Sequence, residues 1–232
     1  MPVWVRLLIF NDMKKPRHVL VFTICFLLFA PALFSQKKVS ELTLVYEYSF
    51  SSTGKGSAPA AENAVHTVYI KGNKSRSEIT NSLFSSVTIF DANTGFGVIL
   101  KEVSGQRLLI RINPENWSER NRMYDGIVYK NTNETKDIAG YKCVKAIGQT
   151  AAGATITVYY TRDIVPENHQ YEPPFRALDG LPLEYELTSG QQTIRYKITR
   201  INLNPVPESK FDLPRSGYRE MNYEESKNLK IN

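Results

Sequence analysis

The chain has 232 residues, of which 22% are charged, and a formal net charge of +6 at pH 7. Residues 1–35 hold four basic residues and one acidic residue. The rest of the chain therefore has 25 basic and 22 acidic side chains, a net charge of +3 that is spread along its length. That balance argues against a nucleic-acid-binding surface, which needs clustered positive charge.

The N-terminal residues have the parts of a secretory signal peptide. From Met13 the chain reads "MKKPRHVLVFTICFLLFAPALFS", in which basic residues precede an apolar run over residues 19–28, and small residues follow up to Ser35. The run is short for a membrane span, and the alternative interpretation is a retained N-terminal anchor. We predict a signal peptide at 1–35, with translation starting at Met13, and one exported domain at 36–232, located in the periplasm or outside the cell.

Beyond residue 35 the chain contains one cysteine, Cys143, and two histidines, His66 and His169. A single thiol in an exported protein cannot form an internal disulfide, so the core alone must stabilise the fold. Cys143 lies in the alternating stretch "GYKCVKAIG", which favours a buried structural residue over a reactive nucleophile.

Period-two alternation predicts antiparallel strands along most of this domain. In "ELTLVYEYSF" five apolar side chains share one face: Leu42, Leu44, Tyr46, Tyr48 and Phe50. A loop of small and polar residues follows at 51–64. Further strands are predicted at 65–71, 74–80 and 87–91, the first two joined by a tight turn at Gly72-Asn73.

The next predicted hairpin, "FGVILKEVSGQRLLIRIN", has apolar residues on both faces, so something must cover each face of the sheet here. One cover is predicted directly after it, in "NPENWSERNRMY". Asn113 suits an N-cap and Pro114 the first position of a short helix. Trp117 would be the main apolar residue of that helix, and such a tryptophan more often fills a core gap than contacts a ligand.

Two more hairpins complete the predicted sheet. The first joins 141–147 to 155–161. The second turns at Gly190-Gln191. The register set by this turn pairs oppositely charged residues on one face of the hairpin and apolar residues on the other face. The predicted partners are Glu186 with Arg195, Glu184 with Lys197, Leu187 with Ile194, Tyr185 with Tyr196, and Leu183 with Ile198.

The connection between these hairpins, residues 162–183, is long and contains four prolines, which exclude a long regular element. It ends in the apolar elbow "LDGLPL", residues 178–183. Apolar side chains argue against disorder, and we interpret the connection as a tethered flap. The elbow either fills the protein's own core or closes over an apolar group from outside.

Motifs for catalysis are missing. The two histidines and one cysteine have no metal-ligand spacing, and no nucleophile elbow, phosphate-binding loop or dinucleotide fingerprint occurs. Glu184 and Glu186 imitate a catalytic carboxylate pair, but the predicted register pairs each with a basic residue. We therefore expect no enzyme activity, no metal and no cofactor.

A resemblance to known proteins rests on segments that occur in this order between residues 65 and 221: "VYIKGNKSRSEI", "TIFDANTG", "TKDIAGYKCVKA", "TVYYTRDI", "LDGLPLEYE" and "FDLPRSGYREM". They resemble secreted bacterial proteins of unknown function, related to those named for a Gly-Leu-Pro-Gly-Leu-Ile motif, which "DGLPL" matches in part. Such proteins are similar to the LolA/LolB lipoprotein-carrier superfamily. The resemblance implies a mainly β fold, a curved antiparallel sheet or half-open β-barrel with short covering helices.

From these features we expect a monomeric, non-enzymatic binding protein that holds a lipid, an acyl chain or a lipoprotein in a half-barrel cavity closed by the connection. Trp117 would form the floor of that cavity. The residues expected to contact the ligand are Phe175, Leu181, Leu183 and Tyr185. The alternative is a structural or interaction module of the cell envelope, with a filled core and a protein partner.

Overall fold

The computed structural model describes residues 36–52, 64–103 and 105–228. The predicted signal peptide, residues 1–35, and most of the predicted polar loop, residues 53–63, lie outside the described residues. Gln36–Asn232 form one compact unit.

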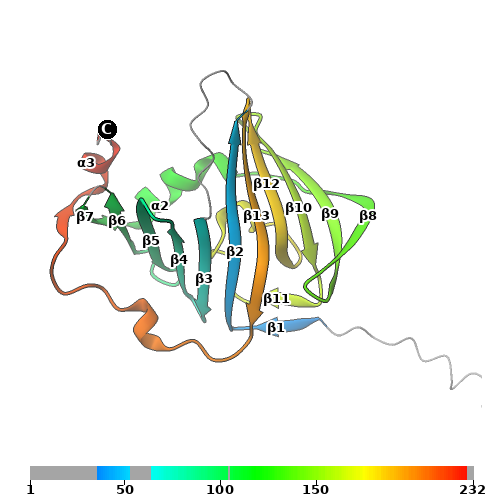
Figure 1. The fold of residues 1–232 in the computed structure, drawn as a ribbon, viewed down its shortest axis with the longest axis horizontal. Helices are drawn as coiled ribbons and strands as arrows, with labels where there is room; N and C mark the ends of the chain where they lie inside the picture. Colours follow the sequence, from blue (N-terminus) through cyan, green and yellow to red (C-terminus); the bar gives the residue numbers. More distant parts are fainter. Residues whose placement is uncertain (1–35, 53–63, 104, 229–232) are drawn as a thin grey trace, which may run out of the picture. The chain divides into compact units, whose positions relative to one another are not determined.

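One twelve-stranded sheet dominates this unit, in the order β14-β7-β6-β5-β4-β3-β2-β13-β12-β10-β9-β8 (Figure 1). It is curved and open, with β14 and β8 at its two edges. This mainly β architecture with few short helices confirms the predicted fold class. Its strands are β2 (Glu41–Ser52), β3 (Ala64–Lys71), β4 (Lys74–Thr80), β5 (Phe84–Asp91), β6 (Gly97–Val103), β7 (Gln106–Ile112), β8 (Lys130–Ile138), β9 (Tyr141–Gln149), β10 (Thr155–Thr161), β12 (Leu181–Ser189), β13 (Gln192–Asn202) and β14 (Arg219–Met221).

Short elements lie outside this sheet. The strands β1 (Lys37–Val39) and β11 (Ile164–Pro166) pair in parallel with each other. Asn113 caps α2 (Pro114–Asn121) by accepting from the backbone N–H of Asn116, as the sequence predicts. The remaining helices are η1 (Arg122–Tyr124), η2 (Pro173–Phe175), η3 (Glu208–Phe211) and α3 (Tyr223–Lys227).

The last hairpin confirms most of its predicted register. Glu184, Tyr185, Glu186 and Leu187 oppose Lys197, Tyr196, Arg195 and Ile194, respectively. The predicted Leu183–Ile198 pair is not part of this ladder, although both side chains are buried in one core cluster. The salt-bridge prediction is half right: Arg195 Nε donates to Glu186 Oε1 at 2.6 Å, but Glu184 accepts from Lys136 Nζ of β8 at 2.8 Å.

Strand β8 was missed because its sequence, "KNTNETKDI", has no apolar alternation. All its residues are exposed or half-buried except Ile138 at its end. A polar edge strand needs only backbone pairing to its neighbour, and its charges discourage pairing with another chain. Hydrophobic periodicity therefore gives no signal for it.

Directly paired residues lie on the same face of the sheet, so the register separates two faces. We call the face toward α2 the inner face. One row across it contains Leu44, Val68, Ser77, Thr88, Ile99 and Ile110. The corresponding row on the outer face contains Tyr69, Arg76, Ile89, Val98 and Arg111.

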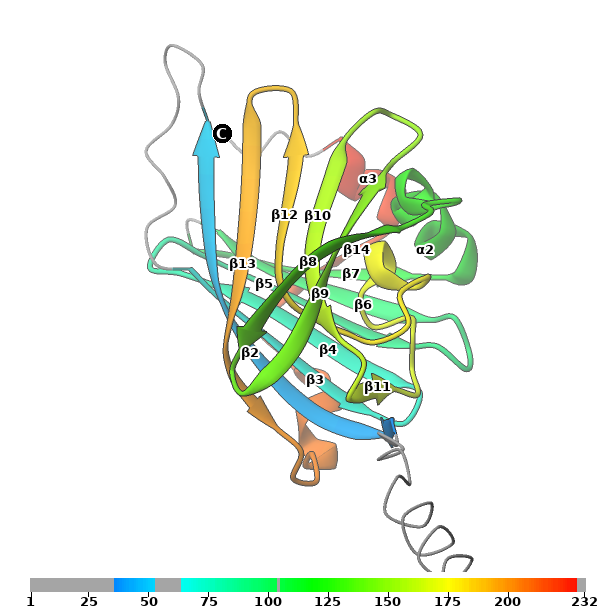
Figure 2. The ribbon, with the colours of Figure 1, turned by 90° about the vertical axis from the view of Figure 1, so that its right-hand side faces the viewer.

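The connection 162–183 and the helix α2 cover the inner face (Figure 2). The largest core cluster joins apolar side chains of the sheet to those of the connection, including Ile164, Tyr171, Phe175, Leu178 and Leu181. A second cluster packs Trp117 of α2 against Ile99 and Ile110. The predicted need for a cover over this part of the sheet is met.

The outer face of strands β3 to β7 is covered by residues 203–218, which we call the crossing segment. It runs from the end of β13 across β3 to β7, after which β14 pairs in parallel with β7 (Figure 1). Arg76 Nη1 donates to Lys210 O at 3.0 Å, and Lys210 Nζ lies 4.6 Å from the centre of the Tyr69 ring. Tyr218 packs on a third cluster that includes Val98 and Leu100. The two apolar faces of β6 thus have two different covers.

Replacing Gly180 with alanine should strongly destabilise the fold. An ideal Cβ at Gly180 would lie 2.1 Å from the Thr161 carbonyl oxygen, at the point where the elbow enters β12. We expect a loss of about 3 kcal/mol in the free energy of unfolding, measured with urea. Gly153→Ala is the control, since Gly153 has open space around it and only its φ of +83° opposes a side chain. Equal losses in both variants would contradict the close packing of the elbow.

Candidate functional site

The five residues expected to contact a ligand lie at different depths in the structure. Leu181 and Leu183 are 0% exposed, and Phe175 and Tyr185 are also buried. Phe175 and Tyr185 are in edge-to-face contact, with ring centres 4.6 Å apart. Trp117 is half-buried and stacks on Phe90 with ring centres 3.8 Å apart. It packs on the second cluster, which contains Ile99 and Ile110.

The connection fills the core in this structure, whereas the sequence was interpreted as a flap over an open cavity. Hydrogen bonds hold it at several points. Tyr46 Oη donates to the Pro182 carbonyl at 2.9 Å, Tyr129 Oη donates to the Pro174 carbonyl at 2.9 Å, and β1 pairs with β11 at its start. Contact of Leu181 or Leu183 with a ligand would require the connection to leave the core.

A small space remains on the inner face, which we call the inner chamber. Its volume is about 170 Å³, and it lies between α2, the connection and strands β4, β5, β12 and β13. Trp117 and Tyr185, two of the predicted contact residues, line it. The other lining residues are Ser75, Ser77, Thr88, Arg120, Asn121, Tyr124, Tyr171, Glu172, Pro173, Pro174, Leu187 and Tyr196. The chamber is therefore aromatic and polar rather than purely apolar.

A polar pair lies beside this chamber: Glu172, which lines it and is largely buried, and His66, which is buried. His66 Nε2 is 2.8 Å from Ser77 Oγ and 3.4 Å from Glu172 Oε1. Burial lowers the pKa of His66 to about 4 and raises the pKa of Glu172 to about 8. Both groups are therefore mainly neutral at pH 7.

Neither member of this pair was predicted from the sequence as a site residue. His66 occupies an inner-face position in β3, between the buried residues Ala64 and Val68. The position of His66 among alternating apolar residues could therefore have indicated that its side chain is buried. Glu172 lies in the irregular connection, where no periodic pattern could show that its side chain is buried.

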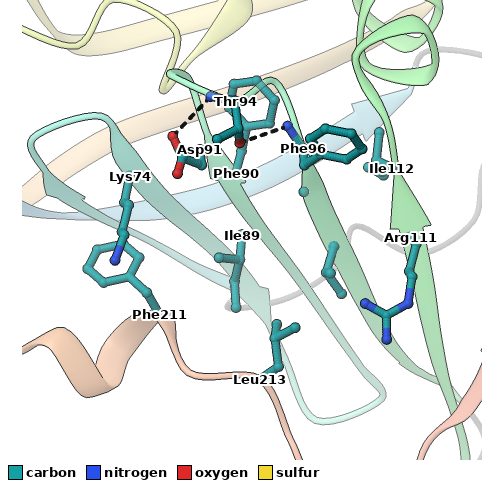
Figure 3. A pocket seen from close by; sticks show the side chains of 12 residues that line it. Lys74, Ile89, Phe90, Asp91, Thr94, Phe96, Arg111, Ile112, Phe211 and Leu213 are labelled. Atoms are coloured by element: carbon teal, nitrogen blue, oxygen red, sulfur yellow. Dashed lines mark hydrogen bonds between the residues drawn. The ribbon is translucent and has the colours of Figure 1, made fainter.

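A second space lies on the outer face of the sheet and is more apolar, and we call it the outer groove. Its volume is about 330 Å³. Figure 3 shows the side chains that line it. Ile89 and Val98 of the outer-face row form part of its wall, and Phe211 and Leu213 of the crossing segment face them. Further lining residues are Lys74, Phe90, Asp91, Thr94, Phe96, Gly97, Arg111 and Ile112.

Exposed apolar side chains and paired charges border the outer groove. Phe96 is 58% exposed and Leu213 is 39% exposed, which is high for side chains of this size. Lys74 and Arg111 lie on opposite sides of the groove (Figure 3). Each forms an ion pair, Lys74 with Glu208 and Arg111 with Glu220, so the charges are balanced within the protein.

Cys143 shows no feature of a reactive thiol. It is fully buried, and burial raises the pKa of its thiol to about 11, so the thiolate is rare at pH 7. Across residues 36–52, 64–103 and 105–228, no group of three or more histidine, cysteine or acidic side chains could hold a metal ion. Within the same ranges, no helix has the length and apolar character needed to cross a membrane.

Known protein-family models and curated protein sequences include no match to the chain. Solved structures of similar fold include PNGF-II, with a TM-score of 0.47 and 14% identity over 82% of this chain. The chain spans about a third of the length of PNGF-II, since the match covers 33% of that protein.

The matches to two further solved structures cover most of those proteins' own chains. A LolA superfamily protein from Nitrosomonas europaea has a TM-score of 0.39 and 10% identity, over 77% of this chain and 92% of that protein. The lipoprotein LppX of Mycobacterium tuberculosis has a TM-score of 0.33 and 13% identity, over 70% and 88%, respectively. A LolA superfamily protein is thus among the similar folds, as the sequence resemblance predicted. These values describe a loose likeness of fold and carry no functional argument.

Replacing Leu181 with aspartate should unfold the domain. A charge at a fully buried position without a partner costs several kcal/mol, which is comparable to the whole stability of a typical domain. We expect loss of the cooperative thermal transition, measured by circular dichroism. Leu213→Asp is the matched control on the exposed surface and should unfold normally. A folded Leu181→Asp variant would instead support a connection that opens as a flap.

Glu172→Gln should stabilise the protein at alkaline pH and change stability little in acid. The pKa of Glu172 is about 8 in the folded state and about 4.5 otherwise, so the stability that this group contributes is complete below pH 4.5 and is lost as the pH rises to about 8. The advantage of the glutamine variant should grow by up to about 1.4 kcal/mol per pH unit in that window and then remain constant.

Urea unfolding at several pH values measures this difference. His66 titrates in both proteins, so its opposite contribution, which is lost as the pH falls through about 4, cancels in the comparison. Glu186→Gln removes an exposed carboxylate and serves as the control. A difference between Glu172→Gln and the natural protein that does not vary with pH would contradict the buried carboxyl.

Proposed function

We propose that this protein is an exported, non-enzymatic binding protein that holds one apolar chain, such as a lipid acyl chain, in the outer groove. The single observation that carries the proposal is an open, apolar space of about 330 Å³ whose mouth exposes Phe96 and Leu213. That volume lies within the range of ligand pockets, whereas the inner chamber is smaller than that range. The apolar ligand expected from the sequence is therefore proposed for the opposite face of the sheet.

The driving force for binding would be the burial of apolar surface. Each Å² of apolar surface removed from water contributes about 25 cal/mol, and the ligand would cover Phe96, Leu213 and the half-buried Phe211 together. An acyl chain would lie against Ile89 and Val98, between the sheet and the crossing segment.

The charges around the groove suit a ligand that is apolar along its length and polar at one end. The charges of Lys74 and Arg111 are balanced by ion pairs, and Asp91 accepts from the backbone N–H groups of Asn93 and Thr94. The ion pairs also place polar atoms on either side of the groove, where a polar headgroup could remain in contact with water. The lining residues that could act as a base or nucleophile are Lys74, Asp91 and Thr94. Lys74 is paired with Glu208, and Asp91 and Thr94 accept from backbone N–H groups of their own turn, which supports structural roles for all three.

Export of the protein is part of the proposal and is supported by the sequence of residues 1–35. Basic residues, a short apolar run and small residues occur there in the order of a signal peptide. A periplasmic or extracellular location would give the groove access to lipids of the cell envelope.

A second candidate function is an interaction module of the envelope. The burial of Leu181 and Leu183 in the protein's own core favours it, because the connection then completes the fold and closes over no cargo. In that case the exposed Phe96 and Leu213 would contact a protein partner.

Native mass spectrometry of protein exported through its own signal and purified without detergent tests the proposal. We expect an extra mass that organic solvent releases and that is identified as a lipid. The double variant Phe96→Asp, Leu213→Asp should lose most of this mass because two charges at the mouth oppose apolar burial. Its stability should change little, since both side chains are exposed.

Val128→Asp is the matched control, because Val128 is exposed and does not line the groove. It should retain the lipid. A bare protein mass, unchanged after incubation with envelope lipids, would contradict lipid binding and favour the interaction module. Retention of the lipid by the double variant would contradict the outer groove as its site.

A further inference from the structure

Glu172 is a carboxyl group whose surroundings provide little to stabilise its charge. Its side chain is 15% exposed, and its ionic contact is with His66, at 3.4 Å. Burial lowers the pKa of His66 to about 4, so this histidine is neutral near pH 7 and supplies no balancing charge. Among the described residues, no lysine or arginine forms an ion pair with Glu172, and no side chain donates a hydrogen bond to its carboxylate. Ionised Glu172 thus lacks a cationic partner.

Two other buried polar atoms near Glu172 lack a hydrogen-bond partner among the described residues. They are the hydroxyl oxygen of Tyr171 and Nδ1 of His66. Tyr171 and His66 are 7% and 2% exposed, respectively, and Tyr171 lines the inner chamber next to Glu172. Buried polar groups without partners are uncommon in native structures and are costly to maintain. Because Tyr171 lines the chamber, its unpartnered hydroxyl indicates a missing partner that would occupy this space.

The remaining wall of the chamber is aromatic. Tyr185 and Tyr196 stack with ring centres 4.4 Å apart, and Tyr196 also meets His66 edge-on at 5.4 Å. Tyr124 and Trp117 line the chamber from the side of α2. Faces of aromatic rings attract cations, and this attraction is strongest where water is excluded.

We propose that the inner chamber binds a small molecule that carries a primary ammonium group. Its N–H groups would donate to the Glu172 carboxylate and to the Tyr171 hydroxyl, and its charge would lie against the rings of the chamber wall. The small volume of about 170 Å³ limits the part of the ligand that enters to an ammonium group with a few carbon atoms. This site lies on the opposite face of the sheet from the outer groove, so the inference does not depend on the proposed lipid binding.

The charges around the chamber favour a cation over an anion inside it. Arg120 is exposed and lines the chamber from the C-terminal half of α2, so it can meet an anionic part of the ligand outside. The phenols near Glu172 belong to Tyr46, Tyr124, Tyr171, Tyr185 and Tyr196. Burial raises the pKa of each of them, so all are neutral near pH 8. With His66 also neutral, Glu172 and Arg120 are the charged residues of the chamber wall, and Glu172 is the less exposed of the two.

Titration of the full protein with n-butylammonium chloride and with n-butanol tests the inference. The two probes have nearly the same shape and differ in charge. At pH 8.5 and constant ionic strength, NMR chemical-shift changes should give at least about tenfold tighter binding for butylammonium than for butanol, a difference that corresponds to about 1.4 kcal/mol. The shift changes should cluster on chamber residues, including Tyr124, Glu172 and Tyr196.

Glu172→Gln should remove the preference for butylammonium, whereas Glu186→Gln, which loses a carboxylate on the other face of β12, should retain it. The glutamine variant at position 172 keeps the shape of the side chain, so its folding can be confirmed from its spectrum. Equal affinity for the two probes in the natural protein would overturn the inference. Shift changes outside the chamber, or a preference that survives Glu172→Gln, would overturn it as well.

Discussion

The structure depends on the burial of the elbow of the connection against the inner face of an open sheet. Twelve strands that do not close into a barrel have two broad faces. Where a face is apolar, another segment must cover it to keep it from water. Leu181 and Leu183 enter the same cluster as Leu42 and Leu44 of β2 and so tie the connection to the centre of the sheet. The position of Glu172 and the size of the inner chamber both follow from this packing.

The spaces on the two faces of the sheet differ in chemistry because different segments cover the two faces. On the inner face, the hydroxyl residues Ser75, Ser77 and Thr88 lie below α2 and a connection rich in tyrosine and proline, which leaves a polar and aromatic chamber. On the outer face, the crossing segment places Phe211 and Leu213 over Ile89 and Val98 and leaves an apolar groove. One sheet thereby presents two kinds of space, a polar and aromatic one below α2 and an apolar one below the crossing segment.

Much of the sheet could be predicted from the sequence, because its signals are local. Alternation in β2 and complementary pairs in the last hairpin each determine which side chains share a face. The path of the connection could not be predicted this way, since "LDGLPL" is equally compatible with a flap and with a core segment. Its buried state depends on contacts with β2, more than a hundred residues away. The outer groove was also missed, because its walls come from strands β4 to β7 and from Phe211 and Leu213, and no local pattern links them.

The central position of β2 has a consequence for the order in which the protein can assemble. Its partner on one side, β3, follows directly in the chain, but its partner on the other side, β13, arrives much later, and Thr199 Oγ1 bonds Val45 O across 154 residues. A chain that emerges N-terminus first therefore keeps one long edge of β2 bare until almost all of the domain has emerged. Contacts this distant in sequence make folding slow, and an unpaired apolar strand can associate with other chains in the meantime. The central strand β2 therefore needs protection from other chains until the late strand β13 completes the sheet.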